Sequence, residues 1–263
     1  MFTNNFDPVA FYFFSLEIRW YSLAYILGII IGWLYSKKYL IKDRSILNIF
    51  DDLITYLIIG IILGGRLGYI LFYNFDYYLN NLNEVLMLWK GGMSFHGGVI
   101  GVFISIILFS KKHNINPFTF LDIISVVAPI GIFLGRIANF LNSELYGKET
   151  EVFWSVIYPK VDNLTRHPSQ IYEAIFEGLI LFLILNLLVK KNLLYKKGII
   201  SSCFLIFYSL FRFVLEFFRE PDPQVGYLII SMTMGQILSL FLFIIGIGLL
   251  LKNLQKYCYI RFL

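Results

Sequence analysis

Three arginines and one histidine stand inside long apolar stretches of this sequence, where charged side chains are costly. They are Arg66, Arg136, Arg212 and His96. An arginine at the centre of a membrane helix costs about 2.5–3.5 kcal/mol on insertion scales. A structural ion pair or snorkelling from a helix end would explain such residues, but a guanidinium also matches the geometry of a phosphate. We therefore expect an anion-binding enzyme site within or beside a lipid bilayer.

Arg136 and Arg212 have polar neighbours at helical spacing. In PIGIFLGRIANFLNSELYGKE, Asn139 lies one turn after Arg136 on the same helix face. Tyr208 and Glu216 lie four residues to either side of Arg212, so the three form one polar stripe on an apolar helix. Such a stripe must face protein, water or ligand rather than lipid. Both arginines are therefore candidates for binding a phosphate.

His96 and Arg66 are both flanked by glycines, in WKGGMSFHGGVIG and LGGRLGYILFYN. Glycines let another backbone or a ligand approach closely. An imidazole with an ordinary pKa near 6.5 suits proton transfer at neutral pH, so His96 is the candidate general base. A structural role is the alternative for His96, and glycine-rich packing or an ion pair explains Arg66 equally well. Of the other two histidines, His113 and His167, the second is the better candidate for a site.

The sequence lacks the common motifs of metal and cofactor enzymes. We find no P-loop, HExxH, CxxC, GxSxG or dinucleotide-binding motif, and no cluster with metal-ligand spacing. The two cysteines, Cys203 and Cys258, offer no disulfide framework. We therefore expect no metal and no organic cofactor, and a site that uses only His, Arg, Tyr, Asn and Glu side chains.

The elements that must position these residues are membrane helices. The chain has 263 residues, of which 58% are hydrophobic and 15% charged, whereas a soluble domain carries about 25% charged residues. Seven apolar stretches approach the roughly 20 residues that span a bilayer. The fold class we predict is an all-α polytopic membrane protein with one domain over residues 1–263. The predicted spans are Trp20–Ser36, Leu53–Tyr73, Gly92–Ser110, Phe120–Leu141, Tyr172–Val189, Gly198–Phe218 and Ser231–Leu251.

The positive charges of the loops predict the orientation of the chain. Lysines and arginines gather after the first, third, fifth and seventh stretches, which places the N-terminus outside and the C-terminus in the cytoplasm. This placement also accounts for the net charge of +5 without a nucleic-acid partner. The longest loop, residues 142–170, would lie outside, and its apolar segment VFWSVIYP could be a strand or an interfacial segment. The start of the chain has no features of a secretory signal peptide.

Six blocks of the sequence together resemble the prolipoprotein diacylglyceryl transferases of bacteria. GRIANFLNSELYG is similar to the family signature, and the other blocks follow the family's order between about Trp20 and Leu240. One departure is Ala138, which stands where the family usually has glycine. The other five blocks are GGRLGYILFYN, GGMSFHGG, RHPSQIYE, FRFVLEFFREPD and MGQILSL.

The resemblance implies a reaction and its partners. Such an enzyme transfers the diacylglyceryl group of phosphatidylglycerol to the thiol of a prolipoprotein's lipobox cysteine and releases glycerol phosphate. It lies in the bacterial inner membrane among membrane lipids, with the active site toward the periplasm. The family's important positions correspond to Tyr21, His96, Arg136, Asn139, Glu144, Gly147, Tyr208 and Arg212. We add Arg66 and Asn142 as predicted substrate-binding residues.

The resemblance and the chemistry together suggest roles for these residues. A free thiol is only a few per cent thiolate at neutral pH, so a base is needed. His96 is the first choice and Tyr208 a relay, and the choice between them stays open. Arg136 and Arg212 would stabilise the charge that grows on the phosphate. Glu144 would orient an arginine or a glycerol hydroxyl.

Three other functions compete with this interpretation. A lipid transporter would predict inverted repeats, and the sequence contains none that we can detect. A membrane scaffold would not need polar stripes directed into the bundle. A different lipid enzyme, such as an acyltransferase, would show a nucleophile motif or an HxxxxD pattern, and neither is present.

Overall fold

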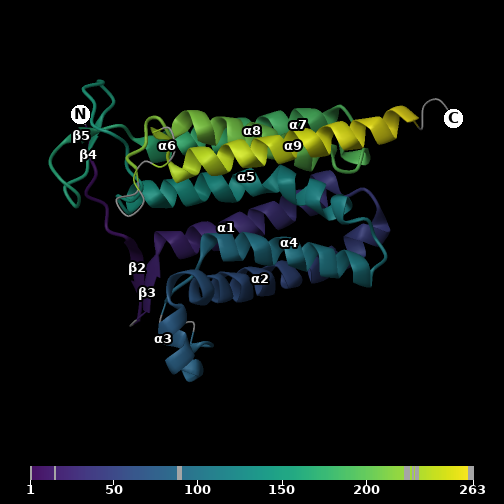
Figure 1. The fold of residues 1–263 in the computed structure, drawn as a ribbon, viewed down its shortest axis with the longest axis horizontal. Helices are drawn as coiled ribbons and strands as arrows, with labels where there is room; N and C mark the ends of the chain where they lie inside the picture. The colour runs from purple at the N-terminus through teal and green to yellow at the C-terminus, as the bar shows by residue number, and fades with distance from the viewer. Residues whose placement is uncertain are drawn as a thin grey trace. The chain divides into compact units, whose positions relative to one another are not determined.

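Helices make up most of the chain in the computed structural model (Figure 1), which describes residues 2–14, 16–87, 91–221, 226, 228 and 231–259. The chain divides into two compact units. Unit 1 comprises Met1–Leu40 and Asp122–Leu263, and unit 2 comprises Ile41–Leu121. The prediction of a single membrane domain over residues 1–263 stays a prediction.

A helix lies at each of the seven predicted stretches. Among the described residues, four helical segments are long and apolar enough to cross a membrane: Arg44–Tyr73, Pro117–Leu141, Ser169–Lys190 and Met234–Tyr257. The chain is therefore a polytopic helical membrane protein, while the count of seven spans and the orientation stay predictions. The long helices are α1 (Trp20–Tyr35), α2 (Arg44–Tyr73), α4 (Phe95–Lys112), α5 (Pro117–Leu141), α7 (Leu181–Lys190), α8 (Ile199–Leu215) and α9 (Met234–Tyr259).

Shorter helical segments extend or connect these helices. The π-helical η1 (Ser36–Leu40) continues α1, while α3 (Phe75–Asn80) and the 3-10 turn η2 (Leu82–Glu84) follow α2. The short α6 (Ser169–Glu173) and the π-helical η4 (Ala174–Ile180) lead into α7, and η5 (Leu193–Tyr195) precedes α8.

The second helix begins nine residues earlier than the predicted span at Leu53. Asp43 caps its N-terminus, accepting a hydrogen bond from the Ser45 amide at 2.8 Å. Asp51 and Asp52 are exposed in this added part of α2. The helix therefore extends beyond the apolar stretch from which the span was predicted.

In the described part of the chain, five short strands add a β component that the all-α prediction did not include. In unit 1, β1 (Phe2–Thr3) pairs in parallel with β4 (Val156–Ile157), which pairs antiparallel with β5 (Thr165–Arg166). The strands β2 (Val9–Phe13) and β3 (Leu16–Arg19) form a hairpin that leads into α1. Strand β4 lies inside VFWSVIYP, so the strand alternative for that segment is confirmed.

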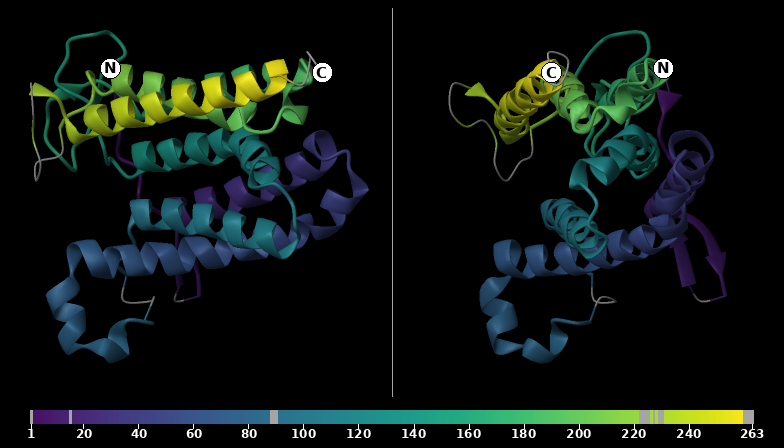
Figure 2. Two further views of the ribbon diagram at one scale, coloured as in Figure 1. Left: turned by 45° about the vertical axis from the view of Figure 1, so that its right-hand side comes forward. Right: turned by 90° about the vertical axis from the view of Figure 1, so that its right-hand side faces the viewer.

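Glycines bring α2 and α4 together in unit 2, where the two helices lie side by side (Figure 2). A Cβ added at Gly64 would lie 2.9 Å from the Gly101 Cα and would also meet the Gly97 carbonyl oxygen. Gly60 and Gly68 approach the same face of α4 just as closely. The glycines that repeat every four residues in α2 and α4 therefore serve close helix packing, a common role of this spacing in membrane helices.

In unit 1, α8 and α9 lie side by side (Figure 1) and are tied to α5 at one end. The Asp122 carboxylate of α5 accepts hydrogen bonds from the backbone N–H groups of Gly198 at 2.6 Å and Ser201 at 2.8 Å. These are N–H groups at the start of α8, which lack partners within the helix. Gly198 also lies against the Asn253 side chain of α9. The residues beside this end include Lys196, Lys197, Lys252 and Lys256.

The N-terminal segment joins the loop of residues 142–170 elsewhere in unit 1. The buried Asn4 is held by two hydrogen bonds. Its backbone N–H donates to the Ile157 carbonyl at 2.9 Å, and its side-chain amide donates to the Phe140 carbonyl at 2.5 Å. Phe2 stacks on Phe140 with ring centroids 6.2 Å apart. The N-terminus therefore packs where α5 ends.

Candidate active site

A buried cluster of arginines and glutamates occupies the interior of unit 1. The glutamate side chains at positions 173 and 177 are fully buried, and those of Arg136 and Arg212 are 16% and 11% exposed. One residue comes from α5, two from the α6–η4 segment, and three from α8 or the residues that follow it. We call this set the Arg–Glu cluster: Arg136, Glu173, Glu177, Arg212, Glu216 and Arg219.

Glu173 connects all three arginines of the cluster. Its Oε2 lies 3.0 Å from Arg136 Nη1, and its Oε1 accepts a short hydrogen bond from Arg212 Nη1. Arg219 Nη1 lies 3.8 Å from the same Oε1. A buried carboxylate is tolerated when it is paired in this way, and removal of its partners leaves an uncompensated charge. Glu173 therefore holds α5, α6 and α8 in register.

The two other glutamates each pair mainly with one arginine. Arg136 Nη2 donates to Glu177 Oε2 at 3.0 Å, whereas Arg212 Nη1 is 3.7 Å from Glu177 Oε1. Arg212 Nη2 lies 2.6 Å from Glu216 Oε2 along α8. Glu216 Oε1 also accepts a hydrogen bond from the Thr233 hydroxyl at 2.9 Å.

Local sequence brings the cluster together in two ways. Glu173 and Glu177 are four residues apart, and the π-helical η4 begins between them at Ala174. Gly178 in η4 packs against Phe133, where an added Cβ would lie 2.9 Å from the Phe133 Cα. This close approach brings the acids of η4 to α5, because Arg136 lies one turn after Phe133.

Tyr208 belongs to the same interior site. It interacts electrostatically with Arg136, Arg212, Glu173 and Glu177, and its ring stacks on Phe204 with centroids 5.7 Å apart. The predicted stripe of Tyr208, Arg212 and Glu216 therefore faces protein, as argued from its spacing.

A second set of polar contacts lies at the end of α5, where the predicted residues Tyr21, Asn139, Asn142 and Glu144 meet. The buried Asn139 amide donates a short hydrogen bond to Tyr21 Oη and lies 3.5 Å from Glu144 Oε2. Asn142 donates to Glu144 Oε1 at 3.4 Å. Arg136 and Asn139 are one turn apart on α5, so the helix presents the charged and the neutral polar groups together.

Glycine is required at position 147 because its backbone lies very close to the backbones of His167 and Phe218. Its N–H donates to the His167 carbonyl at 3.0 Å, and it forms an isolated β-bridge with Arg219. A Cβ at this position would lie 2.6 Å from the His167 Cβ and 2.8 Å from the Phe218 carbonyl oxygen. The predicted importance of Gly147 therefore has a structural reason.

His96 and Arg66 belong to unit 2, which is described separately from the Arg–Glu cluster of unit 1. His96 is exposed in the first turn of α4. Ser94 caps this helix, and its hydroxyl accepts a hydrogen bond from Gly97 N at 3.2 Å. Ser94 N donates to the Gly65 carbonyl at 2.8 Å. That His96 acts at the same site as Arg136 stays a prediction.

Arg66 is 3% exposed and directs its guanidinium at backbone carbonyls of unit 2. Its Nε donates to Val85 O at 2.8 Å, its Nη1 to Gly91 O at 2.5 Å and Gly92 O at 3.3 Å, and its Nη2 to Glu84 O at 2.7 Å and Met87 O at 3.2 Å. The Tyr78 ring lies 5.1 Å from its Cζ. A guanidinium has five N–H donors, so these contacts match its capacity. They give Arg66 a structural role through backbone carbonyls, which differs from the ion pair considered from the sequence, and its substrate-binding role stays a prediction.

Each unit has a cavity among its described residues. In unit 1, a cavity of about 530 Å³ lies between α8 and the segment around α6, and its lining includes Phe176, Phe211 and Phe218. The polar atoms of its rim are paired with one another: Tyr172 Oη contacts Trp154 Nε1 at 2.5 Å and His167 Nδ1 at 3.1 Å. Burial lowers the pKa of His167. The cavity is therefore an apolar neighbour of the cluster.

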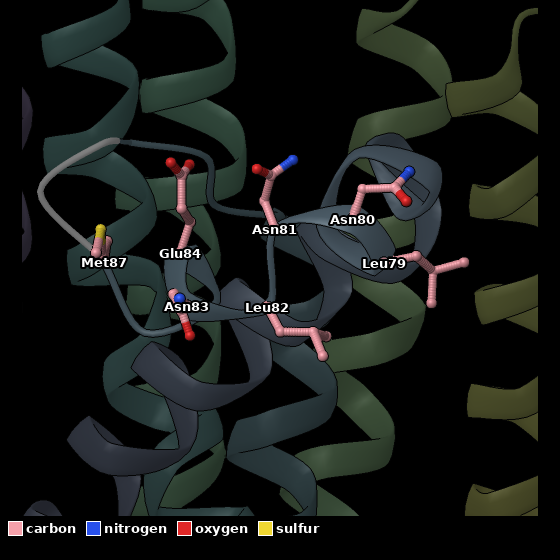
Figure 3. Close-up of a pocket in the computed structure, with 7 residues that line it drawn as sticks. All are labelled: Leu79, Asn80, Asn81, Leu82, Asn83, Glu84 and Met87. Carbon is pink, nitrogen blue, oxygen red and sulfur yellow. The ribbon is translucent and has the colours of Figure 1, made fainter.

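The cavity in unit 2, of about 450 Å³, is formed by the loop after α3 (Figure 3). Figure 3 shows the amide of Asn81 and the carboxylate of Glu84 pointing to the same side, while Leu79 and Leu82 point elsewhere. Its lining contains none of the residues predicted to form the site. Within the described parts of both units, no group of three or more His, Cys, Asp or Glu is arranged to hold a metal ion.

The sequence-based prediction missed four residues of this site: Glu173, Glu177, Arg219 and Thr233. A signal for the two glutamates was present, because two acids four residues apart stand at the start of a predicted span. Arg219 lies just beyond the predicted span that ends at Phe218, and nothing in the sequence around Thr233 points to Glu216.

The fold and this site define a polytopic helical membrane protein with buried charged groups in its interior. Residues 8–252 match the family model described as "Prolipoprotein diacylglyceryl transferase". Curated relatives carry the name "Phosphatidylglycerol--prolipoprotein diacylglyceryl transferase". One from Rickettsia bellii is 51% identical over 252 residues, covering 95% of this chain and 96% of the relative. One from Rickettsia felis is 48% identical, covering 96% and 98%, and one from Rhodopseudomonas palustris is 49% identical, covering 95% and 91%. The chain belongs to the prolipoprotein diacylglyceryl transferase family.

Proposed function

We propose that this chain works as the names of its relatives state: it is a transferase that moves the diacylglyceryl group of phosphatidylglycerol to a prolipoprotein. The acceptor is the thiol of the lipobox cysteine, and the reaction is the first step of bacterial lipoprotein lipidation. The observation that carries this conclusion is the match of about half of all residues over nearly the whole length of several transferases.

The reaction forms one bond and breaks one bond. The thiol sulfur of the prolipoprotein attacks C3 of the glycerol that carries the acyl chains, and the bond from C3 to the phosphate oxygen breaks. The bonding electrons leave with the oxygen as glycerol phosphate, and the thiol proton passes to a base. Negative charge therefore grows on the leaving phosphate, where donors prearranged in a site of low dielectric stabilise it most.

Arg136 and Arg212 are the proposed donors to this phosphate. Their guanidinium groups meet around shared glutamates, with Arg136 Nη1 3.0 Å from Glu173 and Arg212 hydrogen-bonded to the same carboxylate. A phosphate between them could receive hydrogen bonds from both forks. The side chains of Arg136 and Arg212 are 16% and 11% exposed, which supports access of a phosphate to both guanidinium groups.

Tyr21, Asn139, Asn142 and Glu144 are proposed to bind the polyol headgroup. These residues form a connected set of amide, phenol and carboxylate groups one helical turn from Arg136. Glu144 contacts the two asparagines, which favours the orientation of a glycerol hydroxyl as its role. Gly147 supports the same segment through its bond to His167.

His96 is proposed as the general base, with Tyr208 as a relay. The proposal for His96 rests on the chemistry of imidazole and on its correspondence with the family's histidine. Tyr208 has the position for a relay, because it interacts with both arginines and both interior glutamates.

The chain is proposed to lie in the bacterial inner membrane with its N-terminus outside, its C-terminus in the cytoplasm and its site toward the periplasm. Two features of unit 1 support this. The lysine-rich segments beside α8 and α9 adjoin the end tied by Asp122, whereas the N-terminal strand β1 pairs with β4 in residues 142–170. The residues from Asn139 to Gly147 lie at the latter end. The proposed partners are phosphatidylglycerol, surrounding membrane lipids and the lipobox segment of prolipoproteins.

Purified protein in phosphatidylglycerol nanodiscs, given a lipobox peptide, tests the proposal. We expect a thioether-linked diacylglyceryl peptide and an equal amount of released glycerol phosphate. A peptide with serine in place of the lipobox cysteine is the matched control and should release none. Arg136→Gln should lower turnover by about 10²–10³-fold, the usual loss for one oxyanion donor. Glycerol phosphate release without peptide modification would instead identify a hydrolase.

A further inference from the structure

The Arg–Glu cluster is electrically balanced before any substrate is present. Its members are three arginines and three glutamates, and each arginine lies within 4 Å of at least one of the carboxylates. An added phosphodiester would give the buried site a net negative charge. An uncompensated charge in a low-dielectric interior is costly. Phosphate binding to these arginines therefore requires that one carboxylate leaves them and loses its negative charge.

Glu177 is the carboxylate that is held least. Each of the three glutamates has one buried oxygen without a hydrogen-bond partner among the described residues, so the ion pairs distinguish them. Glu177 accepts one hydrogen bond, from Arg136 at 3.0 Å, and its other oxygen lies 3.7 Å from Arg212. Glu173 instead contacts three arginines, and Glu216 is held by Arg212 at 2.6 Å and by Thr233 at 2.9 Å. The position of Glu177 is also the useful one, since its two oxygens face Arg136 at 3.0 Å and Arg212 at 3.7 Å.

We propose that Glu177 is the exchangeable counter-ion of the phosphate site: the phosphodiester of phosphatidylglycerol takes its place between Arg136 and Arg212, and the site takes up one proton as it does so. This inference rests on the proposed function and adds a positioning residue to it. In the resting protein Glu177 neutralises the two guanidinium groups in place of a lipid phosphate. On binding, one anion replaces another, so the number of charges in the interior stays balanced.

Several titratable or charged groups surround Glu177. Arg136 faces it from α5, Glu173 precedes it by one turn, and Arg212 and Tyr208 face it from α8. Glu173 is the one other carboxylate in direct electrostatic contact with it in this set. Because Glu173 also holds three arginines, its neutralisation would release the packing of three helices rather than one ligand position.

Calorimetric binding of short-chain phosphatidylglycerol to the detergent-solubilised protein tests this inference. Titrations in buffers of different ionisation enthalpy count the protons taken up, which linkage predicts to be about one per lipid for the unaltered chain. In Glu177→Gln the exchange is no longer needed, so proton uptake should vanish and the lipid should bind at least about tenfold more tightly. Glu177→Asp keeps the charge and should restore proton uptake.

Glu173→Gln is the matched control, because it removes one charge from the same cluster at another position. It should lower the melting temperature and should not tighten binding. Equal tightening in both variants would show that net charge alone matters, and the assignment to Glu177 would be wrong. If Glu177→Gln does not fold, the unaltered chain still decides: lipid binding without proton uptake overturns the inference. Absence of both lipid binding and transfer in the unaltered chain would instead refute the proposed function.

Discussion

Replacement of Arg66 by methionine should destabilise unit 2 without acting on the phosphate. The substitution keeps an unbranched side chain and removes five hydrogen bonds to the carbonyls of residues 84, 85, 87, 91 and 92. Three of these are between 2.5 and 2.8 Å. Each hydrogen bond from a charged group contributes about 1.5–3 kcal/mol.

The expected loss is smaller than the sum of these contributions. The carbonyls lie in a loop, and several of them can be rehydrated once the guanidinium is gone. Three well-formed bonds, each contributing about 1.5–3 kcal/mol and partly replaced by water, give a loss of about 3–5 kcal/mol. Small domains are stable by only about 5–15 kcal/mol, so the variant should fold and melt clearly lower.

Thermal unfolding in detergent and limited proteolysis measure this effect. We expect a lower melting temperature and faster cleavage between α3 and α4, with the Michaelis constant for phosphatidylglycerol unchanged. Arg19→Met is the matched control, because its side chain is 64% exposed and pairs with Glu17 in a surface ion pair; such pairs contribute about 0–1 kcal/mol. Unchanged stability with a raised Michaelis constant would refute this reasoning and establish Arg66 as a substrate-binding residue.

Three further predictions concern packing, pH and catalysis. Gly64→Ala should lower stability by about 1–3 kcal/mol in thermal unfolding, because the added Cβ would meet the backbone of α4, whereas Gly98→Ala, whose nearest neighbour would be 3.8 Å away, should be close to neutral. A hydrogen bond from Arg166 lowers the pKa of Asp162, so this pair stabilises the loop at pH values above the ordinary carboxyl pKa of about 3.9. The stabilisation is lost as the pH falls through the lowered pKa. Proteolysis of the loop should therefore become faster at acidic pH in the unaltered chain, and Asp162→Asn should abolish this pH dependence. His96→Gln should lower transfer to a lipobox peptide by about 10²–10⁴-fold, and near-normal transfer would show that His96 is not the base.

Much of the helical organisation was predictable because it depends on local patterns. Apolar stretches predicted a helix at seven places, and each place contains one. The four-residue spacing of Tyr208, Arg212 and Glu216 placed them on one face of α8, where the structure has Arg212 and Glu216 2.6 Å apart. The glycines that flank Arg66 likewise indicated close packing, and Gly64, Gly65 and Gly68 approach α4 or the residues before it. Periodicity determines such features before any tertiary contact forms.

The short strands could not be predicted in the same way. Strand β1 is two residues long and pairs with β4, more than 150 residues later. Residue types in such short segments carry little information about pairing, so the partner decides the conformation. The extension of α2 to Arg44 was missed for a different reason, since the added turns mix apolar residues with charged ones and do not continue the apolar stretch.

The arginines in apolar stretches show what the sequence by itself determined and what only the tertiary structure decided. From the sequence, their cost in lipid required partners, and their helical neighbours suggested a phosphate site. Which partners they have depends on which helix faces meet. Arg66 meets a loop of its own unit and uses its donors on carbonyls, whereas Arg136 and Arg212 meet Glu173 and Glu177 from another helix. The sequence shows which residues are charged, but only the packing of the helices decides which charges are paired with one another.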